Sequence, residues 1–90
     1  MKLNRDQIEQ KLADTGRWKL NNEKISRLVN FNNFKEAMEF VNKVADEAEK
    51  MDHHPDMNIS YDKVELTLTT HSEGGLTEKD FTLAKKINQL

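Results

Sequence analysis

The sequence contains no cysteine, which excludes disulfide scaffolds, thiolate metal sites and cysteine nucleophiles. No apolar run reaches the roughly 18 residues that a membrane-spanning helix needs, and the first residues lack the apolar stretch of a signal peptide. Neither sign of charge dominates, because 14 Lys and Arg face 16 Asp and Glu for a net charge of −2. This balance argues against nonspecific binding to a nucleic-acid backbone. We therefore expect a cytoplasmic protein that binds no membrane and makes no direct contact with nucleic acid.

What the chain does contain is a regular apolar pattern in a polar background. Its 90 residues are 36% hydrophobic and 33% charged. The regular spacing of the apolar residues argues against disorder. A chain of this length can build one small core but not two, so the sequence predicts a single domain over residues 1–90.

Capping signals mark the first and last of three predicted helices. Asn4 and Gln7 have the spacing of a capping box at the start of the first helix, which should end near Gly16. Thr77 and Asp80 repeat this spacing at the start of the last helix. Both signals are local and do not depend on the rest of the fold.

The strongest helical pattern runs from about residue 33 to about residue 51. Asn33 and Glu36 can form a capping box at its start, and the helix should stop near His53, because Pro55 favours extended backbone in the residue before it. Its apolar stripe consists of Phe34, Ala37, Met38, Val41, Val44, Ala45 and Ala48. A stripe this broad can cover a sheet and also contact a second copy of the chain.

Two further stretches alternate as strands do. Residues 18–31 predict two strands around a polar turn at 21–24, although Arg27 interrupts the alternation and leaves the inward face open. Residues 57–68 predict a hairpin linked at Asp62 and Lys63. The order helix-strand-strand-helix-strand-strand-helix predicts an α+β fold, with a four-stranded antiparallel sheet and three helices on one face.

All three histidines, His53, His54 and His71, lie in one stretch that Glu49 and Asp80 bracket. Glu49 precedes His53 by one helical turn, so the two can face the same way. If the loop after His71 folds back, all five side chains can meet at one rim of the sheet. Adjacent histidines rarely aim at one metal ion, whereas imidazoles suit general acid–base chemistry. Taken singly, each histidine is more often a hydrogen-bonded surface group, and Asp80 has an ordinary role in a first helical turn.

The spacing of these residues resembles the signature of the pterin-4a-carbinolamine dehydratase family. That signature is an acid, three residues, His-His-Pro, five residues, an aromatic, nine residues, a histidine and a later aspartate. The sequence matches it with Glu49, His53-His54-Pro55, Tyr61, His71 and Asp80. The resemblance therefore rests on a specific block and on a histidine distant from it.

Weaker similarity to the family at residues 16–18 and 31–34 extends the resemblance over nearly the whole chain. One departure follows His-His-Pro, where some members carry an aromatic pair after an acid. Here Asp56 is followed by Met57 and Asn58. The departure concerns the expected wall of the pterin pocket and leaves the acid–base groups intact.

The resemblance implies a lyase that converts 4a-hydroxytetrahydrobiopterin to quinonoid dihydrobiopterin and water, in tetrahydrobiopterin recycling, with no cofactor and no metal. Histidines would act as general acid and base. The implied catalytic residues are His53, His71 and His54, supported by Glu49 and Asp80, and the implied substrate-binding residues are His54, Pro55 and Tyr61.

The family also implies a homodimer or homotetramer. A different interpretation is a non-catalytic dimerisation cofactor or assembly protein of the same fold, which would bind a protein partner through the central helix. The complete set of His53, His54 and His71 favours the enzyme.

Overall fold

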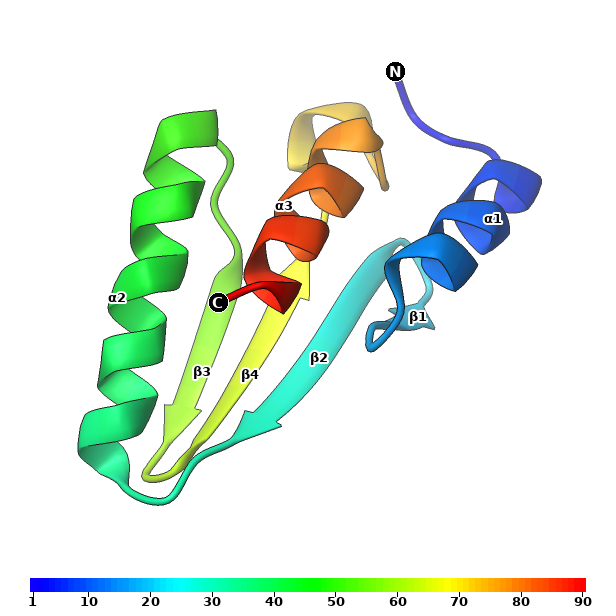
Figure 1. Cartoon of the computed structure of the whole chain (residues 1–90). Helices are drawn as coiled ribbons and strands as arrows, with labels where there is room; N and C mark the ends of the chain where they lie inside the picture. Colours follow the sequence, from blue (N-terminus) through cyan, green and yellow to red (C-terminus); the bar gives the residue numbers. More distant parts are fainter.

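The computed structural model describes all 90 residues and confirms the predicted order of elements (Figure 1). The elements are α1 (Arg5–Thr15), β1 (Lys19–Asn21), β2 (Lys24–Asn30), α2 (Phe34–Met51), β3 (Asp56–Ser60), β4 (Lys63–Leu68), a short 3₁₀ turn η1 (His71–Glu73) and α3 (Glu78–Asn88). None of the helices combines the length and the apolar content that a membrane span requires.

The sheet is antiparallel throughout, with strand order β1-β2-β4-β3. Its register pairs Ile25 with Leu68 and Val29 with Val64. Because side chains alternate across a strand, these residues share one face, and Arg27 shares it with them. The sequence did not decide which face of β2 points inward. The structure shows that Arg27 lies on the inward face, on the side of the helices.

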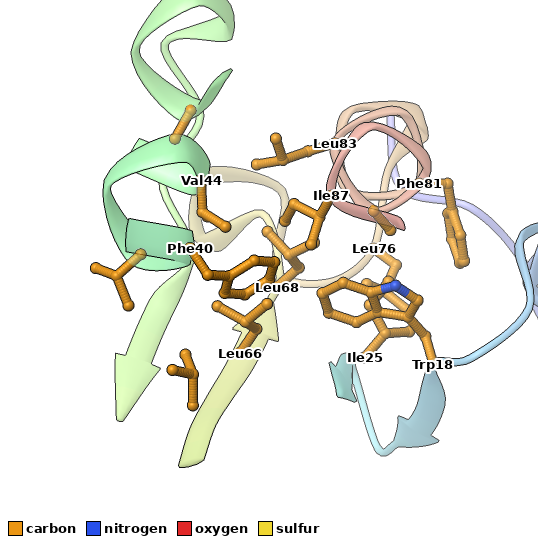
Figure 2. Packing of buried hydrophobic residues seen from close by; sticks show 14 of the residues in the cluster. Trp18, Ile25, Phe40, Val44, Leu66, Leu68, Leu76, Phe81, Leu83 and Ile87 are labelled. Carbon is orange, nitrogen blue, oxygen red and sulfur yellow. The ribbon is translucent and has the colours of Figure 1, made fainter. Parts of the chain in front are cut away.

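All three helices cover this inward face, so the buried side chains form one cluster (Figure 2). The fully buried large aliphatic residues are Ile25, Val44, Val64, Leu66, Leu68, Leu76, Leu83 and Ile87. Burying each contributes about 1.5–3 kcal/mol relative to leaving it exposed. The opposite face of the sheet stays exposed and mainly polar, with Leu28 as its exposed large apolar residue.

The helix starts follow the local capping signals, with one difference. The Asn4 side chain accepts from the Gln7 N–H at 2.9 Å, and the Gln7 side chain accepts from the Asn4 N–H at 2.9 Å, which confirms the first capping box. In α2 the Asn33 side chain accepts from the Glu36 N–H at 2.9 Å, but the Glu36 carboxylate accepts from the Asn32 N–H instead. The predicted box at α2 is therefore only half formed.

One predicted boundary and one predicted core position were wrong. The β3–β4 link is Tyr61-Asp62, one residue earlier than predicted, because Tyr61 adopts a left-handed backbone with φ 52° and Ser60 already pairs with Lys63. Phe34 belongs to the helical stripe but is 50% exposed, so it lies outside the core. Both differences depend on tertiary context rather than on local propensity.

One polar contact across the fold was not predicted. The Asn88 side-chain oxygen accepts from the Trp18 indole N–H and from the Arg27 guanidinium, each at 2.9 Å. Its amide donates to the backbone oxygens of Thr15 and Gly16 at 3.0 and 3.2 Å. The last turn of α3 thereby ties the end of α1 to β2.

We expect Asn88→Ala to lower the free energy of unfolding by roughly 2–3 kcal/mol, because it leaves two part-buried donors without an acceptor. Burial, aided by the charge of Arg17, lowers the pKa of Arg27, so this guanidinium has already lost hydration that the Asn88 oxygen replaces. Urea unfolding of the variant measures the effect. Gln89→Ala, at an exposed neighbouring position, is the control, and equal losses in the two variants would contradict the prediction.

Candidate functional site

Four chain segments meet at one rim of the sheet. These are the end of α2, the link from α2 to β3, the turn after β4 and the start of α3 (Figure 1). They arrive together because β4 runs antiparallel to β3, so the end of β4 lies beside the start of β3. This rim carries the predicted residues Glu49, His53, His54, His71 and Asp80.

His53 and Asp80 form a buried pair. The His53 Nε2 lies 2.6 Å from Asp80 Oδ1. Asp80 is fully buried and His53 is 9% exposed. A buried carboxylate is costly unless it is paired and hydrogen-bonded. The pairing joins the link after α2 to the first turn of α3.

The second oxygen of Asp80 is also satisfied. Asp80 Oδ2 accepts from the Thr70 hydroxyl at 2.8 Å and from the Thr77 N–H at 2.9 Å. The Thr70 and Thr77 hydroxyl oxygens lie 2.9 Å apart. Asp80 and Thr77 were predicted as capping residues, but Thr70 was not predicted. The alternation along β4 could have indicated it, because Thr70 is the next inward position after Leu68 and lies close to the start of the last helix.

His54 and Glu49 form a separate, exposed pair, with His54 Nε2 2.5 Å from Glu49 Oε2. Sequence analysis placed Glu49 beside His53, and the structure corrects this. Asp52 adopts a left-handed backbone with φ 50° at the end of α2, after which His53 is buried and His54 meets Glu49. Their side chains are 55% and 76% exposed, so this pair contributes little to stability.

His71 and Tyr61 differ in their relation to this rim. β4 ends at Leu68 and η1 begins at His71, which places His71 next to Thr70 and exposes it. It makes no side-chain hydrogen bond to the other four residues. Tyr61 lies in the β3–β4 turn, about 16 Å along β3 from its first residue. The structure therefore does not bring Tyr61 to this rim within one chain, whereas Pro55 directly precedes β3.

The rim carries two histidine–carboxylate pairs and the unpaired His71. No three His, Asp, Glu or Cys side chains gather as metal ligands would. A hollow of about 420 Å³ borders η1 and is lined in part by Thr70, Glu73 and Thr77, but none of the histidines lines it. The arrangement is suited to moving protons at a ligand that lies against the rim.

Comparisons with known proteins find similarity over the whole chain. The family model for Pterin 4 alpha carbinolamine dehydratase matches residues 1–90. A relative from Sulfolobus acidocaldarius is 49% identical over 90 residues, covering 100% of this chain and 99% of the relative. A relative from Acidobacterium capsulatum is 52% identical over 83 residues, covering 92% of this chain and 90% of the relative. Both are provisionally named pterin-4-alpha-carbinolamine dehydratases.

Two solved structures are similar in fold. The crystal structure of a transcriptional coactivator/pterin dehydratase from Brucella melitensis has a TM-score of 0.95 and 36% identity, and the match covers 99% of this chain and 97% of that one. A pterin dehydratase-like RuBisCO assembly factor of the alpha-carboxysome has a TM-score of 0.65 and 19% identity, over 81% of this chain and 84% of that one. At that identity the second match shows the fold alone.

Proposed function

Because the chain belongs to the pterin-4a-carbinolamine dehydratase family, we propose that it removes water from 4a-hydroxytetrahydrobiopterin at the histidine rim, using His53 and His71 for proton transfer. The observation that carries this proposal is the buried His53–Asp80 pair at 2.6 Å. A histidine oriented by a buried carboxylate is a recurrent arrangement for proton transfer. The product is quinonoid dihydrobiopterin, and the reaction is that of a hydro-lyase.

The reaction needs two proton transfers. Carbon 4a of the substrate carries the hydroxyl group, and the neighbouring nitrogen 5 carries a proton. Hydroxide is a poor leaving group, so an acid protonates it as its bond to carbon 4a breaks. A base removes the proton from nitrogen 5, and the electrons of that N–H bond form the new double bond to carbon 4a. Water leaves, and proton exchange with solvent returns the acid and the base to their starting states.

The positions of the rim residues support a different role for each of them. Asp80 holds the ring of His53, and His71 lies on the turn that follows Thr70, the other side-chain partner of Asp80. The exposed His54 is within reach of a ligand on the rim and would orient the pterin ring, with Glu49 fixing its imidazole. Pro55 would border the ring where β3 begins.

The test follows the ultraviolet absorbance of freshly made 4a-hydroxytetrahydropterin with wild-type protein and with His71→Ala. We expect rapid decay with the wild type. With the variant we expect a rate that is lower by about 10²-fold or more, which is typical for the loss of one acid–base group. His71 is exposed and makes no side-chain hydrogen bond, so the substitution should leave the fold intact. A circular dichroism melting curve is the control.

Two outcomes would contradict the proposal. If the folded His71→Ala protein retains wild-type turnover, His71 takes no part in proton transfer. If the wild type itself accelerates decay no more than buffer does, the dehydratase proposal fails. In that case the non-catalytic interpretation, with a protein partner on α2, becomes the better one.

A homo-oligomer and a cytoplasmic location remain predictions. Two features support self-association. β3 is an edge strand with unpaired backbone groups. In addition, Phe34 at the start of α2 is 50% exposed, and Leu28 on the bare face of the sheet is 56% exposed. A second copy that covers such surfaces would bury the exposed apolar side chains and pair the free backbone groups of the edge strand.

A further inference from the structure

The Thr70 hydroxyl contacts both Asp80 and Thr77 in the buried network at the rim. A hydroxyl has one proton to donate. The Thr70 hydroxyl donates it to Asp80 Oδ2 at 2.8 Å, so in the 2.9 Å contact between the two hydroxyls Thr70 must accept and Thr77 must donate. The Thr77 N–H also points at Oδ2. Asp80 Oδ2 thus receives two donors from one side.

These donors determine what faces His53. The Thr70 O–H and the Thr77 N–H both donate to Oδ2, so this oxygen acts as an acceptor and cannot itself carry a proton. The other oxygen, Oδ1, faces His53 Nε2 at 2.6 Å. A carboxylate only accepts hydrogen bonds. Opposite a carboxylate oxygen, the neutral His53 ring donates from Nε2, which leaves its lone pair on Nδ1.

The Nδ1 atom of His53 has no hydrogen-bond partner within the chain and is not fully buried. The one buried side-chain polar atom without a partner is Thr15 Oγ1. Nδ1 is therefore not sealed in the core, although the residue as a whole is only 9% exposed. An unbonded ring nitrogen that reaches the surface is placed as a proton acceptor should be.

We propose that Thr70 is a positioning residue which, through Asp80, holds His53 in the tautomer that presents Nδ1 as the proton acceptor. The expected effect of Thr70 on turnover rests on the proposed function. The tautomer itself is a property of the free protein and can be observed without substrate.

The test compares Thr70→Val with Thr70→Ser. Valine keeps the shape of the buried side chain and removes the hydroxyl, whereas serine keeps the hydroxyl. We expect Thr70→Val to lower kcat on the order of tenfold with little change in KM, since it touches no substrate, and Thr70→Ser to stay within about twofold of wild type. Equal losses in the two variants, or a loss confined to KM, would overturn the proposal.

A spectroscopic measurement separates positioning from mere stability. Nitrogen-15 shifts of the His53 ring, assigned by comparison with His53→Gln, are recorded at a pH above the ordinary imidazole range. In the wild type and in Thr70→Ser we expect a protonated Nε2 and an unprotonated Nδ1, and in Thr70→Val a mixture of both tautomers. A proton on Nδ1 in the wild type would overturn the proposal, and this result does not depend on whether the Thr70 variants fold. If the wild type has no dehydratase activity, the proposed function fails, while these shifts still decide the role of Thr70.

Discussion

The His53→Ala variant is expected to lose roughly 10²–10⁴-fold in kcat, the contribution typical of a positioned acid–base group. His53 is the histidine whose ring is fixed by a buried partner, with Nε2 2.6 Å from Asp80. Removing the imidazole removes the group that we propose exchanges a proton with the pterin. Steady-state kinetics of carbinolamine dehydration, followed by absorbance, measures the loss.

A second substitution separates chemistry from stability at this position. His53→Ala leaves the Asp80 carboxylate buried without one of its partners, which is destabilising. His53→Gln can still donate a hydrogen bond to Asp80 but cannot take up a proton near neutral pH. We expect the two variants to lose similar turnover and Gln to lose less stability. Near wild-type kcat in folded His53→Gln would contradict the assignment.

Asp80→Asn is expected to lower kcat by about 10²-fold or more while the fold is kept, because it changes a hydrogen-bond acceptor into a donor at one atom. The oxygen of the new amide must face Thr70 and the Thr77 N–H, which both donate. Its NH₂ group then faces His53 Nε2, so the ring must carry its proton on Nδ1 and can no longer accept one there. Stopped-flow kinetics, with urea unfolding in parallel, measures both effects.

Glu49→Gln is the matched comparison for Asp80→Asn. It makes the same chemical change in an exposed carboxylate of the same rim, whose partner His54 has a side chain that is 55% exposed. Solvent can replace the lost interaction there, so the effect on kcat should be much smaller and seen mainly in KM. If Asp80→Asn loses no more turnover than Glu49→Gln, the buried network has no special part in proton transfer.

The parts of the fold that were predictable from sequence depend on local chemistry. The Asn4–Gln7 capping box needs only two side chains at the right spacing, and it forms as expected. Alternation over residues 57–68 correctly predicted a hairpin, and Val64, Leu66 and Leu68 of its second strand are buried. The common rim was predicted on the condition that the chain folds back after His71, and η1 supplies that turn.

The details that sequence missed depend on single backbone angles and long-range contacts. Whether Glu49 meets His53 or His54 is decided by the left-handed conformation of Asp52, which helical spacing does not foresee. Tyr61 matched the family spacing, but its place in a turn puts it far from His53 within one chain. Thr70 meets Asp80 only because η1 folds the chain back before α3.

The most direct test of the account is the single-turnover rate of 4a-hydroxytetrahydropterin dehydration, measured with excess wild-type protein and with the same excess of His53→Gln. In single turnover, product release does not limit the rate, so the comparison reports the proton-transfer chemistry itself. We expect the wild type to accelerate the reaction well above buffer and His53→Gln to be slower by about 10²-fold or more. Equal rates for the two folded proteins would show that the buried His53–Asp80 pair is structural and that the catalytic site lies elsewhere.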